Sequence, residues 1–547
     1  MNRKHFFIFI ATLCISLLFL CACNSSNSTS SQDLSPTEPP LPSQDAVGEY
    51  HQIKFYHYYL QNKKDDFAIW TDYKKGYISI DGGEYTENID YDSGWLIFPS
   101  DVIPKNKVCN IRVKLKDKDN FEYIDILNVL WIDESITNWN DIQNIGRVQY
   151  LYCVSDINIA DAPAMPNLLH LQINGDGSLY SLNDLIIFTN LQSLHLHRVS
   201  NIDDDISPLA DLINLKYLAI EYCPYLKGDI STFSKIENLN YISLYAHDLQ
   251  GDINSLSSLN KLNYLSLTCE HITGNLENFS NLTSLKQLSI DNKNIEVNLD
   301  HLTSLTNLTS LALIYPEVSG QLSSLSSLTK LNSLTVRGYN DLQGDISDLN
   351  SLNNLTELTL GSSSITGNIS ELPNLRNIEL LYLSYSENIK VNLDTLSQSK
   401  KLKHLTLSRS DNIKGNLDDI SDLTKLTTLF LHDCNKISGN LDSLTRLISL
   451  ENIFISDMEN ITGNLKDLSR FNSLLSLFIS KSDLIEGDLK ELLANKNLEI
   501  LFLSNCAEIK GDLSKLSSLD SLVFVDIYEC NNITGSITID GREYTAN

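Results

Sequence analysis

A glycine returns at a nearly constant interval from residue 228 onward in this 547-residue chain. From Gly228 to Gly535 the interval is always 23 or 24 residues, provided that Val297 and Val391 are counted as occupying the same position. An isoleucine or leucine usually precedes the glycine by two positions, and aspartate or asparagine usually follows it. Such a period predicts an array of equal structural units, each of which buries its apolar side chains only by stacking on its neighbours.

Each unit carries the pattern Leu-x-x-Leu-x-Leu, and three leucine-type residues spaced three apart follow the glycine. The alternation in Leu501-Phe502-Leu503 predicts a short strand with one face buried. The threefold spacing after the glycine predicts a 3₁₀-like turn on the opposite wall. Sixteen such units begin between Leu168 and Leu522, and a shorter one begins at Val148.

This pattern resembles the leucine-rich repeat over roughly residues 148–540. The segment Ile206–Ile220 resembles the internalin style of bacterial repeat, and "ITGNL" resembles the plant-type repeat without its proline. The resemblance implies a curved right-handed solenoid with a parallel β-sheet on its concave face and 3₁₀ or irregular turns on its convex face. It also implies similarity to bacterial leucine-rich-repeat surface lipoproteins, some of which act in adhesion.

Two columns of residues in the repeat have expected roles. Valine hardly tolerates a positive φ, so Val297 and Val391 predict an extended, crowded backbone at the glycine position rather than a left-handed one. The Asp/Asn column after the glycine is expected to bond to turn backbone, with a calcium-binding ladder as the alternative.

The N-terminus predicts export and lipid anchoring. A basic start and the apolar stretch from Phe6 to Leu20 indicate a signal peptide over residues 1–22. The quartet ending in Cys23 resembles a bacterial lipobox, which implies diacylation of Cys23; a plain secretory signal is the alternative. Residues 23–48 are rich in Ser, Pro and Asn and predict a disordered tether. The body is therefore expected on the outer face of the cell membrane, which it contacts only through this anchor.

The remaining chain divides into four predicted parts. Residues 49–125 predict a small β-domain, residues 126–147 an N-terminal cap, and residues 148–534 the repeats. Residues 535–547 predict a capping β-hairpin, because "SITIDGREYTAN" has an Asp-Gly pair between alternating strands. The segment "YISIDGGEYTEN" at residues 77–88 is a near copy of this hairpin.

The net charge restricts the possible binding partners, and the cysteine spacing restricts the possible disulfides. The formal net charge of −28 argues against nucleic-acid binding and against docking on anionic lipid. Seven widely spaced cysteines lie beyond Cys23, and we expect buried free thiols rather than a disulfide framework. No cofactor is expected, and the chain is expected to be a monomer.

Aromatic residues recur at strand positions between the leucines, where side chains should leave the sheet on its concave face. The Phe column consists of Phe430, Phe454, Phe478 and Phe502, and the Tyr column of Tyr217, Tyr241 and Tyr264; Tyr382 lies between the two groups in sequence. Contiguous exposed aromatics often mark binding surfaces, so these residues are the candidate ligand-binding site. Ring stacking alone, self-association and burial under another domain are the alternatives.

A polar cluster, separate from the aromatic columns, combines His170, His195 and His197 with the acidic run Asp203–Asp205. It could hold a transition metal, but solvated polar side chains are the preferred interpretation. Motifs for a serine hydrolase, a P-loop or a zinc peptidase are missing from the sequence, so an enzyme is only a minor alternative. The expected function is recognition or adhesion through a protein or carbohydrate partner. A structural protein that binds another exported protein during envelope assembly is the second candidate.

Overall fold

The computed structural model describes the chain from residue 53 to residue 546, except for residues 57–65, 71–75, 88–89, 93–94, 99–102, 118–119, 134, 137, 155–156, 176–178, 338–341, 362–363 and 540. The predicted signal peptide, Cys23 and the predicted tether lie outside the described residues. The chain divides into two compact units, Met1–Val297 and Asn298–Asn547, which are described separately.

The first unit begins with antiparallel strands. A four-stranded sheet has the order β1 (Ile53–Tyr56), β2 (Asp66–Trp70), β6 (Trp95–Phe98) and β5 (Asp90–Asp92). A second set contains β3 (Gly76–Ile80), β4 (Thr86–Glu87), β7 (Cys109–Asp117) and β8 (Asn120–Ile132). Strand β8 crosses the predicted boundary at residue 125 and pairs in parallel with β9 (Tyr150–Cys153). The division into domains stays a prediction.

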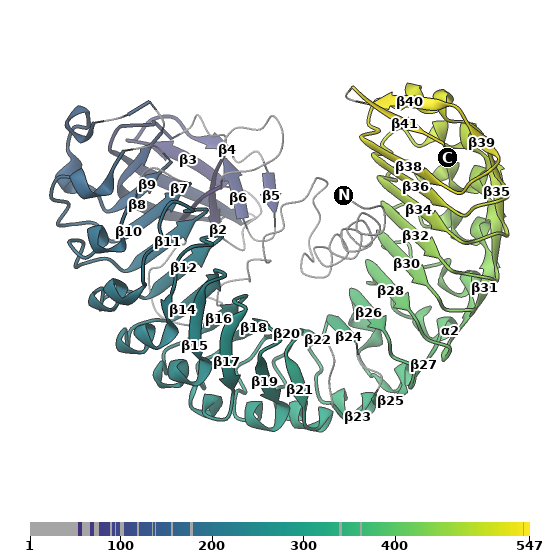
Figure 1. Ribbon diagram of the computed structural model, residues 1–547, viewed down its shortest axis with the longest axis horizontal. Helices are drawn as coiled ribbons and strands as arrows, with labels where there is room; N and C mark the ends of the chain where they lie inside the picture. The colour runs from purple at the N-terminus through teal and green to yellow at the C-terminus, as the bar shows by residue number, and fades with distance from the viewer. Residues whose placement is uncertain are drawn as a thin grey trace. The chain divides into compact units, whose positions relative to one another are not determined.

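The repeats of the first unit add one parallel strand per coil beyond β9 (Figure 1). These are β10 (His170–Asn174), β11 (Ser193–His197), β12 (Tyr217–Glu221), β14 (Tyr241–Tyr245), β16 (Tyr264–Leu267) and β18 (Gln287–Asp291). The glycine segments form the short strands β13 (Gly228–Asp229), β15 (Leu249–Asp252), β17 (His271–Asn275) and β19 (Ile295–Asn298). The 3₁₀ turns are η1 (Trp139–Asp141), η2 (Ile145–Arg147), η3 (Ile159–Asp161), η4 (Leu182–Leu185), η5 (Ser207–Asp211), η6 (Ile230–Lys235), η7 (Ile253–Ser258) and η8 (Phe279–Asn281).

The second unit repeats the same coil. Its main strands are β20 (Ser310–Ile314), β22 (Ser333–Arg337), β24 (Glu357–Gly361), β26 (Leu380–Ser384), β28 (His404–Ser408), β30 (Thr428–His432), β32 (Asn452–Ser456), β34 (Ser476–Ser480), β36 (Ile500–Ser504) and β38 (Phe524–Tyr528). Successive main strands pair in parallel, with no register shift where the phenylalanines face each other.

Its glycine segments are β21 (Glu317–Ser319), β23 (Gly344–Asp345), β25 (Ile365–Asn368), β27 (Ile389–Asn392), β29 (Ile413–Asn416), β31 (Lys436–Asn440), β33 (Ile461–Asn464), β35 (Ile485–Asp488), β37 (Ile509–Asp512) and β39 (Ile533–Thr534). The turns are η9 (Leu299–Leu302), η10 (Leu322–Ser327), η11 (Ile346–Leu349), η12 (Ile369–Glu371), η13 (Leu375–Asn377), α2 (Leu393–Leu396), η14 (Leu417–Ile420), η15 (Leu441–Arg446), η16 (Leu465–Arg470), η17 (Leu489–Ala494) and η18 (Leu513–Ser518). The strands and 3₁₀ turns predicted from the repeat are therefore confirmed.

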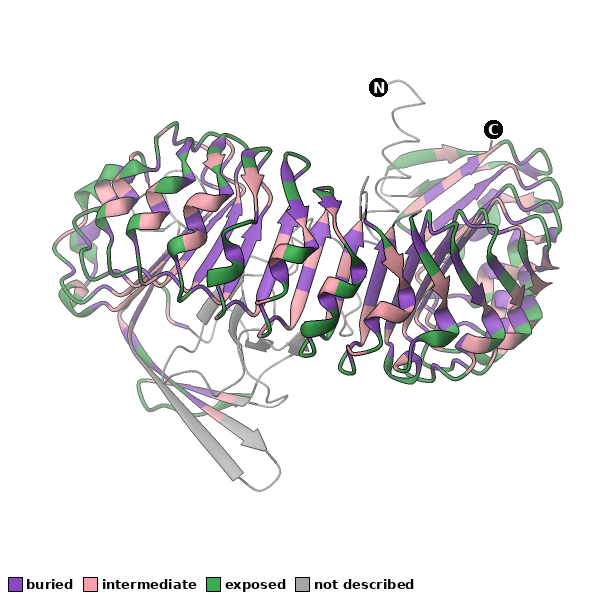
Figure 2. Ribbon diagram, turned by 90° about the horizontal axis from the view of Figure 1, so that it is seen from below, coloured by how far each residue is buried: buried purple, intermediate pink, exposed green. Residues whose placement is uncertain are grey.

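The core of each unit is built from the repeat leucines. In one coil Leu429 and Leu431 from the strand, together with Leu441 and Leu444 from the turn, are fully buried. Exposed residues gather on the turns and connecting segments (Figure 2). A single coil could not bury both walls, so the apolar contacts that stabilise it come from the coils above and below.

The expectation for the glycine backbone is wrong in one respect. Gly463 has φ 144° and Gly415 has φ 136°, in the region that side-chain-bearing residues rarely adopt. The expected crowding is confirmed, because a Cβ on Gly463 would lie 2.7 Å from Leu441 Cβ and 2.9 Å from Leu441 N. Val297 and Val391 are not among the positive-φ residues, so those coils accommodate valine with a different local backbone.

The Asp/Asn column caps the 3₁₀ turns, as expected. The Asn464 side chain accepts a hydrogen bond from Lys466 N at 3.0 Å, and Asp467 accepts one from Asn464 N at 3.1 Å. These reciprocal bonds form a capping box, and the same arrangement occurs at Asp345 and Asn416. The column therefore satisfies turn backbone groups, which is what its short polar side chains do best at a helix start.

The seven cysteines from Cys109 onward are buried free thiols, which confirms that prediction. Burial raises the pKa of Cys269 to about 12, and the Cys269 thiol lies 3.4 Å from the carbonyl oxygen of Leu244. The high pKa keeps this thiol protonated and poorly reactive.

The last coil is followed by a hairpin of β40 (Ser536–Ile539) and β41 (Arg542–Thr545). Tyr544 from this hairpin meets Phe524 of β38 edge-to-face, with ring centroids 6.0 Å apart, and Ile537 is buried. The near copy at β3 and β4 is paired differently, because β3 also pairs with β7 along its other edge. That the C-terminal hairpin protects the last coil stays a prediction.

Candidate functional site

The Phe column lies on the face of the sheet opposite the leucine core, here called the open face. Phe454 alternates with Ile453 and Ile455, which are buried, so its side chain points the other way. Strand pairing sets Phe430 opposite Phe454, Phe454 opposite Phe478, and Phe478 opposite Phe502. The repeat period alone therefore brings together four rings that are far apart in sequence.

The four rings form a continuous stack. Their centroids are 3.9, 4.0 and 4.0 Å apart, and the interplanar angles are 14°, 14° and 2°. The stacking covers ring faces, and Phe430 and Phe502 are only 5% and 3% exposed. Phe454 and Phe478 are half-buried. The stack presents ring edges rather than flat ring faces, so the column is less exposed than its sequence pattern suggests.

Polar residues flank the Phe column on the same face. Two positions later on the strands stand Ser456, Ser480 and Ser504, and two positions earlier stand Asn452 and Ser476. The three serines are buried, whereas Asn452 and Ser476 are half-buried. The partly exposed polar border therefore lies on the side of Asn452 and Ser476, and an apolar centre with a polar rim is found in many protein interfaces.

Charged side chains line the ends of these strands. Lys481 Nζ lies 2.9 Å from Asp457 Oδ1, and Asp457 also lies 3.5 Å from His432 Nδ1. The bond from Lys481 and the hydrogen bond from Ser456 outweigh burial and lower the pKa of Asp457, whereas burial lowers the pKa of His432. Asp457 is therefore charged and His432 neutral at neutral pH.

Tyr382 belongs to the same register as the Phe column. Strand pairing sets Tyr382 opposite Thr406, and Thr406 opposite Phe430. Arg337 donates a hydrogen bond from Nη2 to the Tyr382 hydroxyl at 2.8 Å, and its guanidinium carbon lies 4.5 Å from the centre of the Tyr382 ring. Tyr382 is thus separated from the stack by one threonine and is engaged by arginine instead of by another ring.

The Tyr column is also a stack, and it belongs to the first unit. The centroid distances are 4.1 Å from Tyr217 to Tyr241 and 4.2 Å from Tyr241 to Tyr264. Tyr241 and Tyr264 are 5% and 8% exposed, and burial raises the pKa of both Tyr217 and Tyr241. These hydroxyls stay protonated, and the column offers little surface to a ligand.

The histidine cluster predicted from the sequence is arranged differently in the structure. His195 Nε2 lies 3.2 Å from Glu221 Oε2, and both side chains are nearly buried, so the description as solvated is wrong for His195. His197 Nδ1 lies 2.9 Å from Asn174 Oδ1. His170 stacks on Tyr150 with centroids 4.1 Å apart, and burial lowers the pKa of His170 to about 4.

The carboxylates of Asp203–Asp205 do not pair with these histidines. Asp203 pairs with Lys227 at 2.7 Å, Asp204 accepts hydrogen bonds from Ser181 and Leu182, and Asp205 accepts one from Ser207 N. Sequence reasoning missed Glu221, which follows from strand register: Glu221 stands opposite His197, one coil from His195. It also missed a histidine group beside the glycine segments, because it looked for histidines only at the Leu-x-Leu strands.

No helix in the described part of the chain is both long enough and apolar enough to cross a membrane. Cys23 lies outside that part, so its lipidation stays a prediction.

Comparison with known proteins gives a likeness of fold. No family model and no curated protein matches the sequence. A leucine-rich-repeat protein of Leptospira interrogans is similar with a TM-score of 0.47 and 20% identity, over 70% of this chain and 96% of that chain. The ectodomain of a plant receptor kinase from Arabidopsis thaliana gives 0.46 and 17%, over 75% of this chain and 53% of its own length. An internalin of Listeria monocytogenes gives 0.31 and 20%, over 65% and 86%.

The fold class of the protein follows from observations on its own sequence and structure. It has a 23- or 24-residue period, one parallel strand per coil, a buried leucine core and 3₁₀ turns on the opposite wall. The protein is a leucine-rich-repeat solenoid.

Proposed function

We propose that the Phe column is the centre of a binding surface for a protein partner, and that the chain is a recognition or adhesion protein held at the cell surface by a lipid on Cys23. The observation that carries the proposal is the unbroken four-ring stack on the open face. Large aromatic side chains dominate the binding energy of protein interfaces, because they bury much area at a low cost in conformational entropy.

The geometry of the stack favours protein over carbohydrate. The interplanar angles of 2° to 14° mean that neighbouring rings cover each other's flat faces. A sugar ring packs best against a flat aromatic face, whereas aliphatic and aromatic side chains pack well against ring edges. The half-buried Asn452 and Ser476 side chains would supply hydrogen bonds at the rim.

The double substitution Phe454→Ser with Phe478→Ser tests the proposal. We expect it to weaken capture of a protein from host-surface or envelope extracts roughly 30-fold, because it removes the two half-buried rings. The bound protein is identified by mass spectrometry, and its affinity for purified wild type and variant is then measured by surface plasmon resonance. A glycan array run in parallel should show no binding that depends on these two residues.

A matched control separates binding from stability. Phe471→Leu alters a fully buried ring of the core and leaves the open face unchanged. It should lower the melting temperature yet capture the same protein as the wild type. If the double variant captures its protein with wild-type affinity, or if Phe471→Leu loses capture to the same extent, the Phe column is a stabilising stack and not a binding surface.

A further inference from the structure

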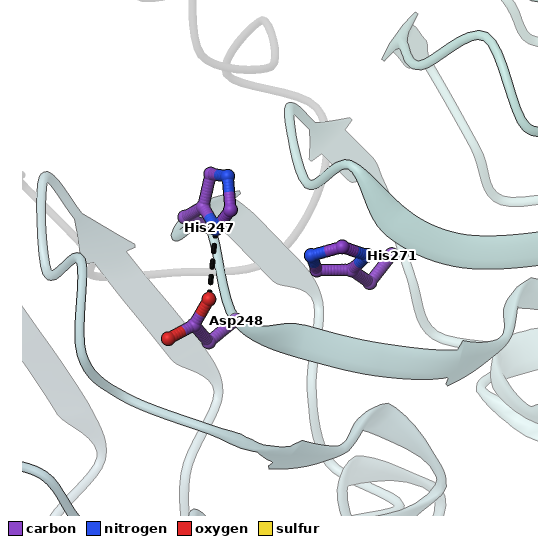
Figure 3. A group of neighbouring side chains, drawn as sticks. All are labelled: His247, Asp248 and His271. Carbon is purple, nitrogen blue, oxygen red and sulfur yellow. Dashed lines mark hydrogen bonds and ion pairs between the residues drawn. The ribbon is translucent and has the colours of Figure 1, made fainter.

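Two turns of the first unit bring histidines and carboxylates together at the surface. His247 and Asp248 lie between β14 and β15, and His271 begins β17 one coil later (Figure 3). One ligand atom from each of these three side chains lies within 4.8 Å of the other two. All three residues are exposed, so an ion can reach them from solvent.

The backbone on either side of the group is anchored in the core. Ala246 and Leu249 flank His247 and Asp248, and both are buried. Cys269 and Ile272 flank the other segment, and both are also buried. The two turns are tied together by the parallel pairing of β15 with β17, in which Gln250 lies opposite His271. The positions of the Cβ atoms are therefore fixed by packing, which is the first requirement of a preorganised metal site.

The side chains have contacts suited to a metal. His247 Nδ1 lies 2.7 Å from Asp248 Oδ1, and His247 Nε2 lies 3.6 Å from Glu270 Oε2. The rings of His247 and His271 meet edge-to-face with centroids 5.2 Å apart. In many metal sites a carboxylate on the far nitrogen of a histidine orients the ring and increases its basicity. Glu270 would do this for His247 after a small side-chain movement, since the 3.6 Å separation is just beyond hydrogen-bond distance.

We propose that His247, Asp248 and His271 bind one divalent metal ion, either Zn²⁺ or a transition-metal ion with the same ligand preference. Two imidazole nitrogens and one carboxylate oxygen are donors that Zn²⁺ prefers, whereas Ca²⁺ and Mg²⁺ require sites built mainly from oxygen. Zinc binds such donors at about 2.0 to 2.2 Å, so the proposal requires these exposed side chains to rotate toward one another when the ion binds. Three protein ligands leave a coordination position open to solvent or to a side chain of another protein.

Zinc binding by the full exported chain at pH 7.5 tests the proposal by isothermal titration calorimetry. We expect one Zn²⁺ per wild-type chain at this site, at least 10-fold weaker binding by His271→Ala, and at least 10-fold weaker binding by Asp248→Ala. His197→Ala is the control, because His197 belongs to the other histidine cluster and already faces Asn174. That variant should bind zinc as the wild type does.

Further readouts make the proposal refutable. Zn²⁺ should raise the melting temperature of the wild type and of His197→Ala but not that of His271→Ala, because a ligand bound only by the folded state stabilises it. Bound Co²⁺ should show no sulfur charge-transfer band, since no cysteine belongs to the group. Equal zinc affinity in wild type and His271→Ala, loss of binding in His197→Ala, or displacement of Zn²⁺ by millimolar Ca²⁺ would each overturn the proposal.

Discussion

Replacing Gly463 by valine is expected to lower the free energy of unfolding by about 4 kcal/mol. Gly463 has φ 144°, which a β-branched residue cannot adopt without strain. Any Cβ there would also lie 2.7 Å from Leu441 Cβ, which is closer than van der Waals contact permits. Urea unfolding followed by circular dichroism measures the loss as a shift of the midpoint, with the slope compared between variants.

Gly361→Ala is the matched control, because Gly361 lies at the end of a strand in the same unit without a positive φ. A Cβ there would meet its nearest neighbour, Arg337, at 3.6 Å, which is ordinary contact. We expect a change below about 0.5 kcal/mol. If Gly463→Val is no less stable than this control, the coil adopts the backbone used at Val391, and neither the close approach nor the positive φ is required.

Replacing Phe471 by alanine should cost about 3 to 5 kcal/mol. Phe471 is fully buried at the end of η16, where it takes the place of a repeat leucine. Its carbonyl oxygen accepts a hydrogen bond from the buried Asn495 side chain at 3.0 Å. Removing the ring leaves a cavity between coils, and the neighbouring coils are too regular to collapse into it. Differential scanning calorimetry and urea unfolding measure the loss.

Phe478→Ala is the comparison that separates the core from the open face. It deletes the same ring atoms, but Phe478 is half-buried and stacked rather than enclosed. We expect it to cost less than half as much as Phe471→Ala, since stacked pairs contribute about 0.5 to 1.5 kcal/mol each beyond area burial. An equal or larger loss at Phe478 would mean that the Phe column is part of the core.

The repeat made the fold predictable because one rule is applied many times. Every Leu-x-Leu segment must bury one face, so the strand, its register and the facing turn follow from spacing alone. The same register explains why Phe430 and Phe502 could be assigned to one column from sequence. It also explains the turn caps, since Asn464 and most of its equivalents stand one residue before a turn.

Contacts between coils are less visible in the sequence. The glycine backbone was misjudged because Val391 shows what the position tolerates in one coil, not what Gly463 adopts in another. The exposure of the Phe column was overestimated, since period-two alternation gives the face of a side chain but not the cover provided by its stacked neighbours. Glu221 was missed as the partner of His195 because the contact is diagonal between neighbouring strands: register sets Glu221 opposite His197, two residues beyond His195.

The search for functional residues at the Leu-x-Leu strands also left out the segments that connect these strands to the glycine segments. His247 and His271 are 24 residues apart, so they belong to neighbouring coils, and that proximity is readable in the sequence. Strand register sets His271 opposite Gln250, so the ring contact between the two histidines also depends on side-chain direction. The role of Asp248 depends on side-chain direction within a turn, and such directions follow from local backbone geometry rather than from periodicity.

The most direct test of the central claim is a ring-to-ring nuclear Overhauser measurement on protein in which only phenylalanine is labelled. The claim is that in-register coils build one aromatic surface, available to a partner, from Phe430, Phe454, Phe478 and Phe502. We predict cross-peaks between each successive pair of rings, none between the first and the last, and shifts of the Phe454 and Phe478 resonances when the captured protein is added. Rings without mutual cross-peaks, or resonances that stay unchanged in the complex, would contradict the account.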